Sequence, residues 1–118
     1  MGIRELLRWQ WSGYARYHRS RTNLLVHVVV VPLFLLGNAG LVLACVEASW
    51  RVALASFGAM VASLALQGLG HRKEEVPPEP FTSPTNAFLR LFLEQWVTFP
   101  RLVASGGWLR ALHRRSEP

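Results

Sequence analysis

Hydrophobic residues gather in two long runs along this 118-residue chain. Residues 24–46 are 23 positions without a formal charge if histidine is neutral, and residues 52–69 are another 18. As helices rising about 1.5 Å per residue, the runs measure roughly 34 and 27 Å, close to the roughly 30 Å hydrocarbon core of a bilayer. The pattern predicts a hairpin of two transmembrane helices, over residues 24–46 and 52–70. The alternative is a buried hairpin of a soluble protein, because the second run is short and contains Ser56, Ser63 and Gln67.

The segments that flank the hairpin are amphipathic or polar. Residues 3–18 combine leucine and aromatic positions with arginines, which favours a helix lying in the headgroup region. Residues 74–84 are proline-rich and predict a surface loop, and residues 85–99 predict a second interfacial helix, too short to span a bilayer. Residues 108–118 form a basic tail. We therefore expect a single domain of the all-α class, an integral membrane helical hairpin with two transmembrane helices, flanked by amphipathic interfacial helices.

The distribution of the +6 net charge favours a membrane over nucleic acid. Residues 1–23 carry five arginines and one glutamate, residues 24–70 carry one charge of each sign, and the remainder carries seven bases and five acids. By the positive-inside rule both termini face the cytoplasm, in a bacterial inner membrane or a cytosol-facing endomembrane. No nucleic-acid partner is expected, since a DNA-binding module needs no membrane-length segment beside its arginines.

Polar side chains with ligand chemistry gather near the cytoplasmic end of the predicted hairpin. The turn centres near residue 49, so His27 lies 22 positions before it and His71 lies 22 positions after it. In an antiparallel hairpin with equal rise per residue, these two histidines reach the same height. The flanking polar residues are His18, which could fold back to this level, Asn23, Gln67 and Glu75. Gln67 and Glu75 share a face with His71 if the helix continues.

The histidine-rich end of the hairpin is a candidate metal site. Ionisable side chains at membrane depth are costly and usually pair or line a cavity. Imidazole nitrogens with a carboxylate suit iron, zinc, copper or nickel, and two histidines with one carboxylate are the ligands of non-haem Fe(II) oxygenases. No two histidines here have a recognised spacing such as H-E-x-x-H. From spacing alone, headgroup-solvated histidines with Glu75 in the solvated charge run RKEE are the alternative.

Two stretches, YARYHRSRTNLLVHVVVVP at residues 14–32 and QGLGHRKEE at residues 67–75, carry a family pattern. They resemble the 2-hydroxy fatty acid dioxygenase-like membrane proteins, named for turning phytosphingosine into odd-numbered fatty acids. The pattern Y-x-x-Y/F-H, N-x-x-x-H with a proline, and Q-x-x-G-H-x-x-x-E matches at Tyr17, His18, Asn23, His27, Pro32, Gln67, Gly70, His71 and Glu75. The chain is shorter than eukaryotic members and has Arg19 where they have a second histidine, which is consistent with a short bacterial-type member.

The resemblance implies an activity and a set of site residues. The activity is Fe(II)-dependent α-oxidation of a 2-hydroxy fatty acid, in which O2 is consumed, the carboxyl carbon leaves as CO2, and the acid becomes one carbon shorter. The implied metal ligands are His18, His27 and His71. Glu75 is implied as a fourth ligand or as the acceptor that fixes a histidine tautomer, with Asn23 and Gln67 next to the ligands. The cations that would attract the substrate carboxylate at headgroup level are Arg16, Arg19, Arg72 and Lys73.

Two other functions remain open from the sequence. One is a non-catalytic membrane scaffold or partner-binding protein, with residues 83–100 as the docking surface. The other is a metalloenzyme that acts on another lipid, such as a hydroxylase or hydrolase, and releases no CO2. The expected partners are a fatty-acid substrate, O2 and the membrane, and the sequence also leaves a homo-oligomer open.

Overall fold

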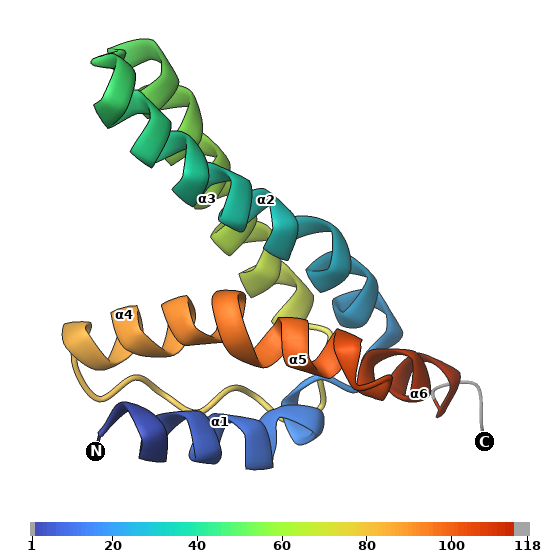
Figure 1. Cartoon of the computed structure of the whole chain (residues 1–118). Helices are drawn as coiled ribbons and strands as arrows, with labels where there is room; N and C mark the ends of the chain where they lie inside the picture. Colours follow the sequence, from blue (N-terminus) through green and yellow to red (C-terminus); the bar gives the residue numbers. More distant parts are fainter. Residues whose placement is uncertain (1, 115–118) are drawn as a thin grey trace.

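The computed structural model describes residues 2–114, and most of these are helical. The elements are α1 (Ile3–Tyr17), α2 (Arg21–Glu47), α3 (Trp50–His71), α4 (Pro84–Leu93), the π-helical turn η1 (Glu94–Thr98), α5 (Phe99–Ala104) and α6 (Gly107–Arg114). In Figure 1 the long hairpin of α2 and α3 rises obliquely from a base in which α1 lies below the row formed by α4 to α6. The all-α class and the helical hairpin are confirmed.

The ends of the hairpin helices are defined by capping residues. The Ser20 hydroxyl accepts a hydrogen bond from the Asn23 amide at the start of α2, and the Ser49 hydroxyl accepts one from the Val52 amide at the start of α3. Ala48, with a φ of 51°, adopts the left-handed conformation that ends α2. Such caps satisfy backbone groups that have no partner within the helix. The turn therefore lies at residues 48–49, where the hydropathy pattern put it.

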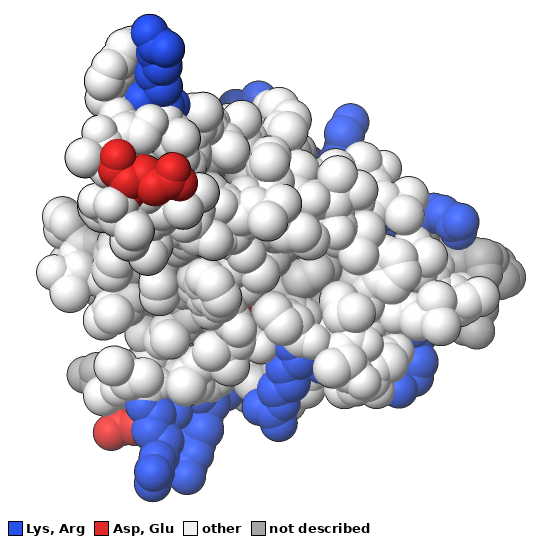
Figure 2. Space-filling view, turned by 45° about the horizontal axis from the view of Figure 1, so that its top comes forward, with Lys and Arg blue, Asp and Glu red and all other residues white. Residues whose placement is uncertain are grey.

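The surface of the hairpin is apolar and largely uncovered by protein. Both helices are long and apolar enough to cross a membrane, and the protein buries only 28% and 11% of their most apolar segments. Val29, Leu36 and Val46 are 69%, 69% and 79% exposed. In the face shown in Figure 2, charged side chains lie around the rim and leave a broad uncharged middle. This exposure disagrees with the alternative of a hairpin buried in a soluble core, because a soluble protein rarely exposes so large an apolar surface.

Glycines allow α2 and α3 to pack closely. A Cβ atom at Gly37 would collide with the Met60 side chain and the Ser56 carbonyl, and one at Gly40 would collide with the Ser56 side chain. Gly58, in contrast, has nothing within 4 Å of its Cβ position and faces outward. The hairpin is thus held by close backbone approach on one face of each helix, as in many helix pairs within membranes.

The base of the molecule contains the buried core. Tyr14, Val31, Phe99 and Leu102 form it, so α1, α2 and α5 meet at this point. Gln10 joins α1 to the α4–η1 segment, because its Nε2 donates to the Arg90 carbonyl over 2.9 Å and its Oε1 accepts from the Thr98 hydroxyl. These contacts fix α1 beside the segment that begins η1.

The C-terminal third is more ordered than the sequence suggested. The helix expected over residues 85–99 begins at Pro84 and continues through η1 to Ala104. Within the basic tail expected over residues 108–118, residues 107–114 form α6, and residues 115–118 lie outside the described residues. Trp108 supplies the reason, because its indole Nε1 donates to the Leu24 carbonyl over 2.8 Å and docks α6 on α2. Residues 72–83 form the connecting loop, which includes all but the last residue of the proline-rich segment expected over residues 74–84.

Candidate metal centre

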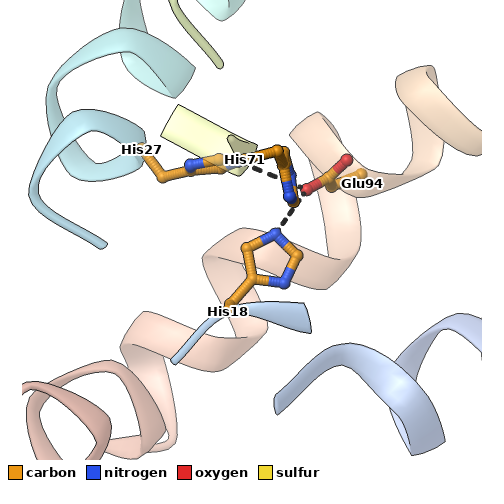
Figure 3. A group of neighbouring side chains, drawn as sticks. All are labelled: His18, His27, His71 and Glu94. Carbon is orange, nitrogen blue, oxygen red and sulfur yellow. Dashed lines mark ion pairs between the residues drawn. The ribbon is translucent and has the colours of Figure 1, made fainter. Parts of the chain in front are cut away.

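Three histidines and a glutamate converge at the base of the hairpin, each from a different element (Figure 3). His18 follows α1, His27 lies in the second turn of α2, His71 is the last residue of α3, and Glu94 is the first residue of η1. The ring centroids of the histidines are 4.7 to 5.0 Å apart. The equal height predicted for His27 and His71 is confirmed by their centroid separation of 5.0 Å.

Backbone carbonyls orient two of the imidazole rings. His18 Nδ1 lies 2.8 Å from the Tyr14 carbonyl, and His27 Nδ1 lies 3.0 Å from the Asn23 carbonyl. A carbonyl only accepts hydrogen bonds, so Nδ1 must carry the proton in each ring, and a neutral ring then presents the lone pair of Nε2. Metal-binding histidines commonly have this arrangement, in which the second nitrogen donates to a carbonyl.

The nitrogens that face the centre have no hydrogen-bond partner. His18 Nε2, His27 Nε2 and His71 Nδ1 are buried and unpartnered. Glu94 Oε2 lies 3.3 Å from His18 Nε2 and 3.7 Å from His27 Nε2, as Figure 3 shows. The Nε2 lone pairs of neutral His18 and His27 therefore face a carboxylate, an arrangement that is favourable only with protons or a metal cation between them. One ligand atom from each of the four residues lies within 4.8 Å of the others, so a single ion can contact all of them.

The Glu94 carboxyl is ionised over the physiological pH range. Burial raises its pKa, but once His18 and His27 carry a proton on Nε2, their hydrogen bonds and charges outweigh burial and hold that pKa well below its ordinary value. The Tyr14 hydroxyl donates to Glu94 Oε2 over 2.7 Å. Burial, together with the negative charge of Glu94, raises the pKa of Tyr14 well above its ordinary value, so this phenol stays protonated and keeps donating. A held, anionic carboxylate is a suitable partner for a cation.

Glu75 does not belong to this cluster, contrary to the expectation from its spacing. The helix ends at His71, so the four-residue spacing no longer places Glu75 on the face of His71, and its side chain is exposed in the loop. The neighbouring Glu74 turns inward and accepts hydrogen bonds from the Arg19 and Ser20 amides, at 2.9 and 3.0 Å. It stabilises the start of α2, and Glu94 supplies the carboxylate of the cluster.

Asn23 and Gln67 lie beside the cluster and hold its surroundings together. Asn23 is fully buried, and its side-chain amide donates to Glu74 Oε2 over 2.7 Å. Gln67 forms two reciprocal 2.8 Å hydrogen bonds with Gln95, which is also fully buried. The amide pair joins α3 to η1, directly after Glu94. Both predicted residues therefore lie near the cluster, as supports of the elements that carry it.

The predicted cations border two cavities at the cluster. A cavity of about 830 Å3 reaches His18, His71 and Glu94 and is bordered by Arg16 and Arg72, whereas Arg19 and Lys73 border a second cavity of about 540 Å3. The four cation side chains are exposed. The larger cavity lies within the range of roughly 300–1,000 Å3 that is typical of ligand pockets.

Sequence reasoning missed Glu94, Tyr14 and Gln95 as parts of the site. A signal was present for two of them, because Glu94 and Gln95 are adjacent polar residues within the largely apolar stretch NAFLRLFLEQWVTF. An ionisable residue in such a context suggests a partner inside the protein. Arg90, four residues earlier, is not that partner, since its guanidinium donates to the Pro80 and Glu79 carbonyls.

One family model matches the chain, over residues 5–101, and its description reads "2-hydroxy-palmitic acid dioxygenase Mpo1-like". The matched range includes all four residues of the cluster and every residue that lines the larger cavity. No curated protein and no solved structure matches the chain.

Proposed function

Because this chain belongs to the 2-hydroxy-palmitic acid dioxygenase Mpo1-like family, we propose that it is an Fe(II)-dependent dioxygenase of 2-hydroxy fatty acids. The reaction converts R–CH(OH)–COOH and O2 into R–COOH, CO2 and H2O, which balances all atoms. O2 is reduced by four electrons, and the two carbons of the hydroxy acid head supply them. The observation that carries the proposal is the convergence of three unpartnered ring nitrogens and the Glu94 carboxylate at one end of a membrane-length hairpin.

The donor set fits iron. His18, His27, His71 and Glu94 would hold Fe(II), because three imidazoles and one carboxylate are ligands that this ion accepts. Bound there, Fe(II) would supply the redox-active centre and the open positions that O2 activation requires, while the substrate is the net source of the electrons. The Tyr14 and Asn23 carbonyls keep two imidazoles in the tautomer that leaves Nε2 free, and the Tyr14 hydroxyl holds the Glu94 carboxylate in place.

The larger cavity suits a substrate with a polar head and an apolar chain. Its lining includes the polar side chains of His18, His71 and Glu94 as well as the apolar side chains of Leu64 and Leu91. Arg72, exposed at the border of this cavity, would attract the substrate carboxylate toward the cluster. The carboxylate and hydroxyl of the substrate thus meet the metal ligands while its chain stays in apolar surroundings.

The site's position suits a membrane orientation with both termini on the cytoplasmic side. The basic residues concentrate outside the hairpin, as the positive-inside rule requires of cytoplasmic segments. His27 lies near the start of α2 and His71 ends α3, so the cluster lies at the end of the hairpin and not midway along it, and a lipid carboxylate could remain at headgroup level while it reacts. This arrangement avoids the cost of moving a charged group into the hydrocarbon core.

Metal content and CO2 release test the proposal together. The protein in detergent is loaded anaerobically with Fe(II), and bound iron and 14CO2 released from a carboxyl-labelled 2-hydroxy acid are measured. We expect stoichiometric iron and CO2 release in the wild type, and loss of both in His27→Ala and His71→Ala. His113→Ala, at an exposed histidine of α6 outside the cluster, is the matched control and should keep its iron.

Two outcomes would overturn the proposal in different ways. Absence of stoichiometric metal in the wild type would leave a non-catalytic membrane scaffold as the better explanation. Bound metal without CO2 release would indicate a metalloenzyme that acts on another lipid.

A further inference from the structure

The larger cavity opens onto the apolar surface of the hairpin at Gly68. This glycine lines the cavity, is exposed, and has nothing within 4 Å of its Cβ position. It lies three residues, or about 4.5 Å of helix rise, from His71. Because glycine has no side chain, α3 leaves a gap in the cavity wall close to the cluster. Any other residue at this position would project a side chain into that gap.

An apolar stripe on α3 continues from this opening away from the cluster. Gly68, Leu64, Val61 and Phe57 are spaced by four, three and four residues, which places them on one face of the helix. Leu64 lines the cavity, while Val61 and Phe57 are 51% and 57% exposed on the surface proposed to face lipid. The stripe forms a continuous path from the cluster to the surroundings of the hairpin.

Another part of the cavity lining is less suited to a hydrocarbon chain. There the Arg90 guanidinium lies over the rings of Trp9 and Phe81, at 4.9 and 4.5 Å from their centroids. It also donates to the Pro80 and Glu79 carbonyls, which ties Arg90 to the loop. A chain directed this way would have to pass a held cation, whereas one directed over Gly68 meets only apolar groups.

We infer that the acyl chain of the substrate leaves the cavity over Gly68, follows the α3 stripe, and remains in lipid beyond Val61. The site then contacts the 2-hydroxycarboxylate and the nearest carbons but does not enclose the end of the chain, so it does not measure chain length. Gly68 is the specificity-determining position, because a side chain there closes the path. This inference rests on the proposed function and adds the route of the chain to it.

The first test uses a 2-hydroxyhexadecanoate that carries a pyrene at its far end. Turnover of this compound and of unmodified 2-hydroxyhexadecanoate is compared in the iron-loaded wild type, and binding is measured by displacement of a fluorescent fatty acid. If the chain end lies in lipid, the pyrene should change kcat/KM and affinity by no more than about threefold. A pocket that encloses the chain would reject the pyrene by about a hundredfold or more, because an enclosed site has no room for the added rings, and this result would overturn the inference.

The second test compares two glycines of α3. Gly68→Leu should lower affinity and kcat/KM for 2-hydroxyhexadecanoate by about tenfold or more. Gly58→Leu is the matched control, since Gly58 is also exposed with an open Cβ position but does not line the cavity. Gly58→Leu gains as much helix propensity as Gly68→Leu, and its affinity and kcat/KM for 2-hydroxyhexadecanoate should equal those of the wild type. Equal effects of the two substitutions, or no effect of Gly68→Leu, would refute the route over Gly68.

Iron content and the binding measurement separate this inference from the proposed function. Both leucine variants should bind as much iron as the wild type, which shows that the fold and cluster persist. If the wild type binds 2-hydroxyhexadecanoate but releases no CO2, the proposed reaction fails, while the effect of Gly68→Leu on binding still decides the route of the chain.

Discussion

Replacing Glu94 by glutamine should weaken metal binding, whereas the same replacement at Glu75 should not. Glu94 Oε2 lies 3.3 Å and 3.7 Å from two unpartnered imidazole nitrogens, and the side chain is only 12% exposed. Glu75 lies exposed in the loop after α3. Each variant keeps the size of the side chain and removes one negative charge, so the pair separates a role in the cluster from a general effect of net charge.

The magnitude follows from the position of the carboxylate. Loss of even a hydrogen-bonding partner behind a metal ligand usually lowers metal affinity by about 10–100-fold. Removal of a carboxylate that itself faces the ion should lower the metal affinity by at least the upper end of this range, about a hundredfold. That factor corresponds to about 2.7 kcal/mol of binding free energy. For Glu75→Gln we expect a change below about twofold, because an exposed charge at a distance is screened by solvent and salt. Tyr14 can still donate to the amide oxygen of Glu94→Gln, so the cluster should keep its shape.

Competition with a chromophoric chelator measures the affinity. The detergent-solubilised variants are titrated anaerobically with Fe(II), and with Co(II) as a spectroscopic substitute whose absorption reports the number of ligands. Circular dichroism before loading controls for helix content. An equal loss of affinity in both variants, or a loss confined to Glu75→Gln, would refute the assignment of the carboxylate to Glu94.

Three further predictions concern stability. Glu74→Ala should lower the free energy of unfolding by about 1–2 kcal/mol in detergent, because two backbone amides before α2 and the Asn23 side chain lose their acceptor; an unchanged unfolding midpoint would contradict this role. Gln95→Leu should lower the free energy of unfolding by about 1–3 kcal/mol, because it leaves the buried Gln67 amide without its partner. In a double-mutant cycle with Gln67→Leu, the double variant should lose less than the sum of the two single losses. Strict additivity would show that the two amides are uncoupled. The metal-free protein should lose stability as the pH falls below roughly 4, because the folded state holds the pKa of Glu94 below its unfolded value and the stabilisation disappears as this carboxyl becomes protonated. Thermal unfolding measured against pH should show a smaller loss of stability in acid for Glu94→Gln than for the wild type. Identical profiles would argue against the pairing of Glu94 with the histidines.

The lesson of Glu74 and Glu75 is that a spacing argument is valid only within one continuous helix. The interval from His71 to Glu75 is correct for one helical face, but α3 ends at His71, where the backbone turns into the proline-rich loop. The residue that fills the position of the expected carboxylate lies 23 positions after His71, on another element. No local periodicity connects these two positions.

The sequence by itself determined the hairpin and the equal height of two histidines of the cluster. Long apolar runs of membrane length have few alternatives to a helix, and equal distances from a tight turn place His27 and His71 at one level because the rise per residue is constant. These features depend only on local geometry. The sequence indicated only that His18 could fold back to this level, and its approach to the other two histidines depends on the packing of α1.

Only the tertiary structure decided which carboxylate completes the cluster and where the cavity opens. Glu94 reaches the histidines because Gln10 holds α1 against α4 and η1, and because the Gln67–Gln95 pair joins η1 to α3. These contacts join residues 28 to 80 positions apart. Their geometry arises from packing of whole elements, which the order of residues along one helix does not encode.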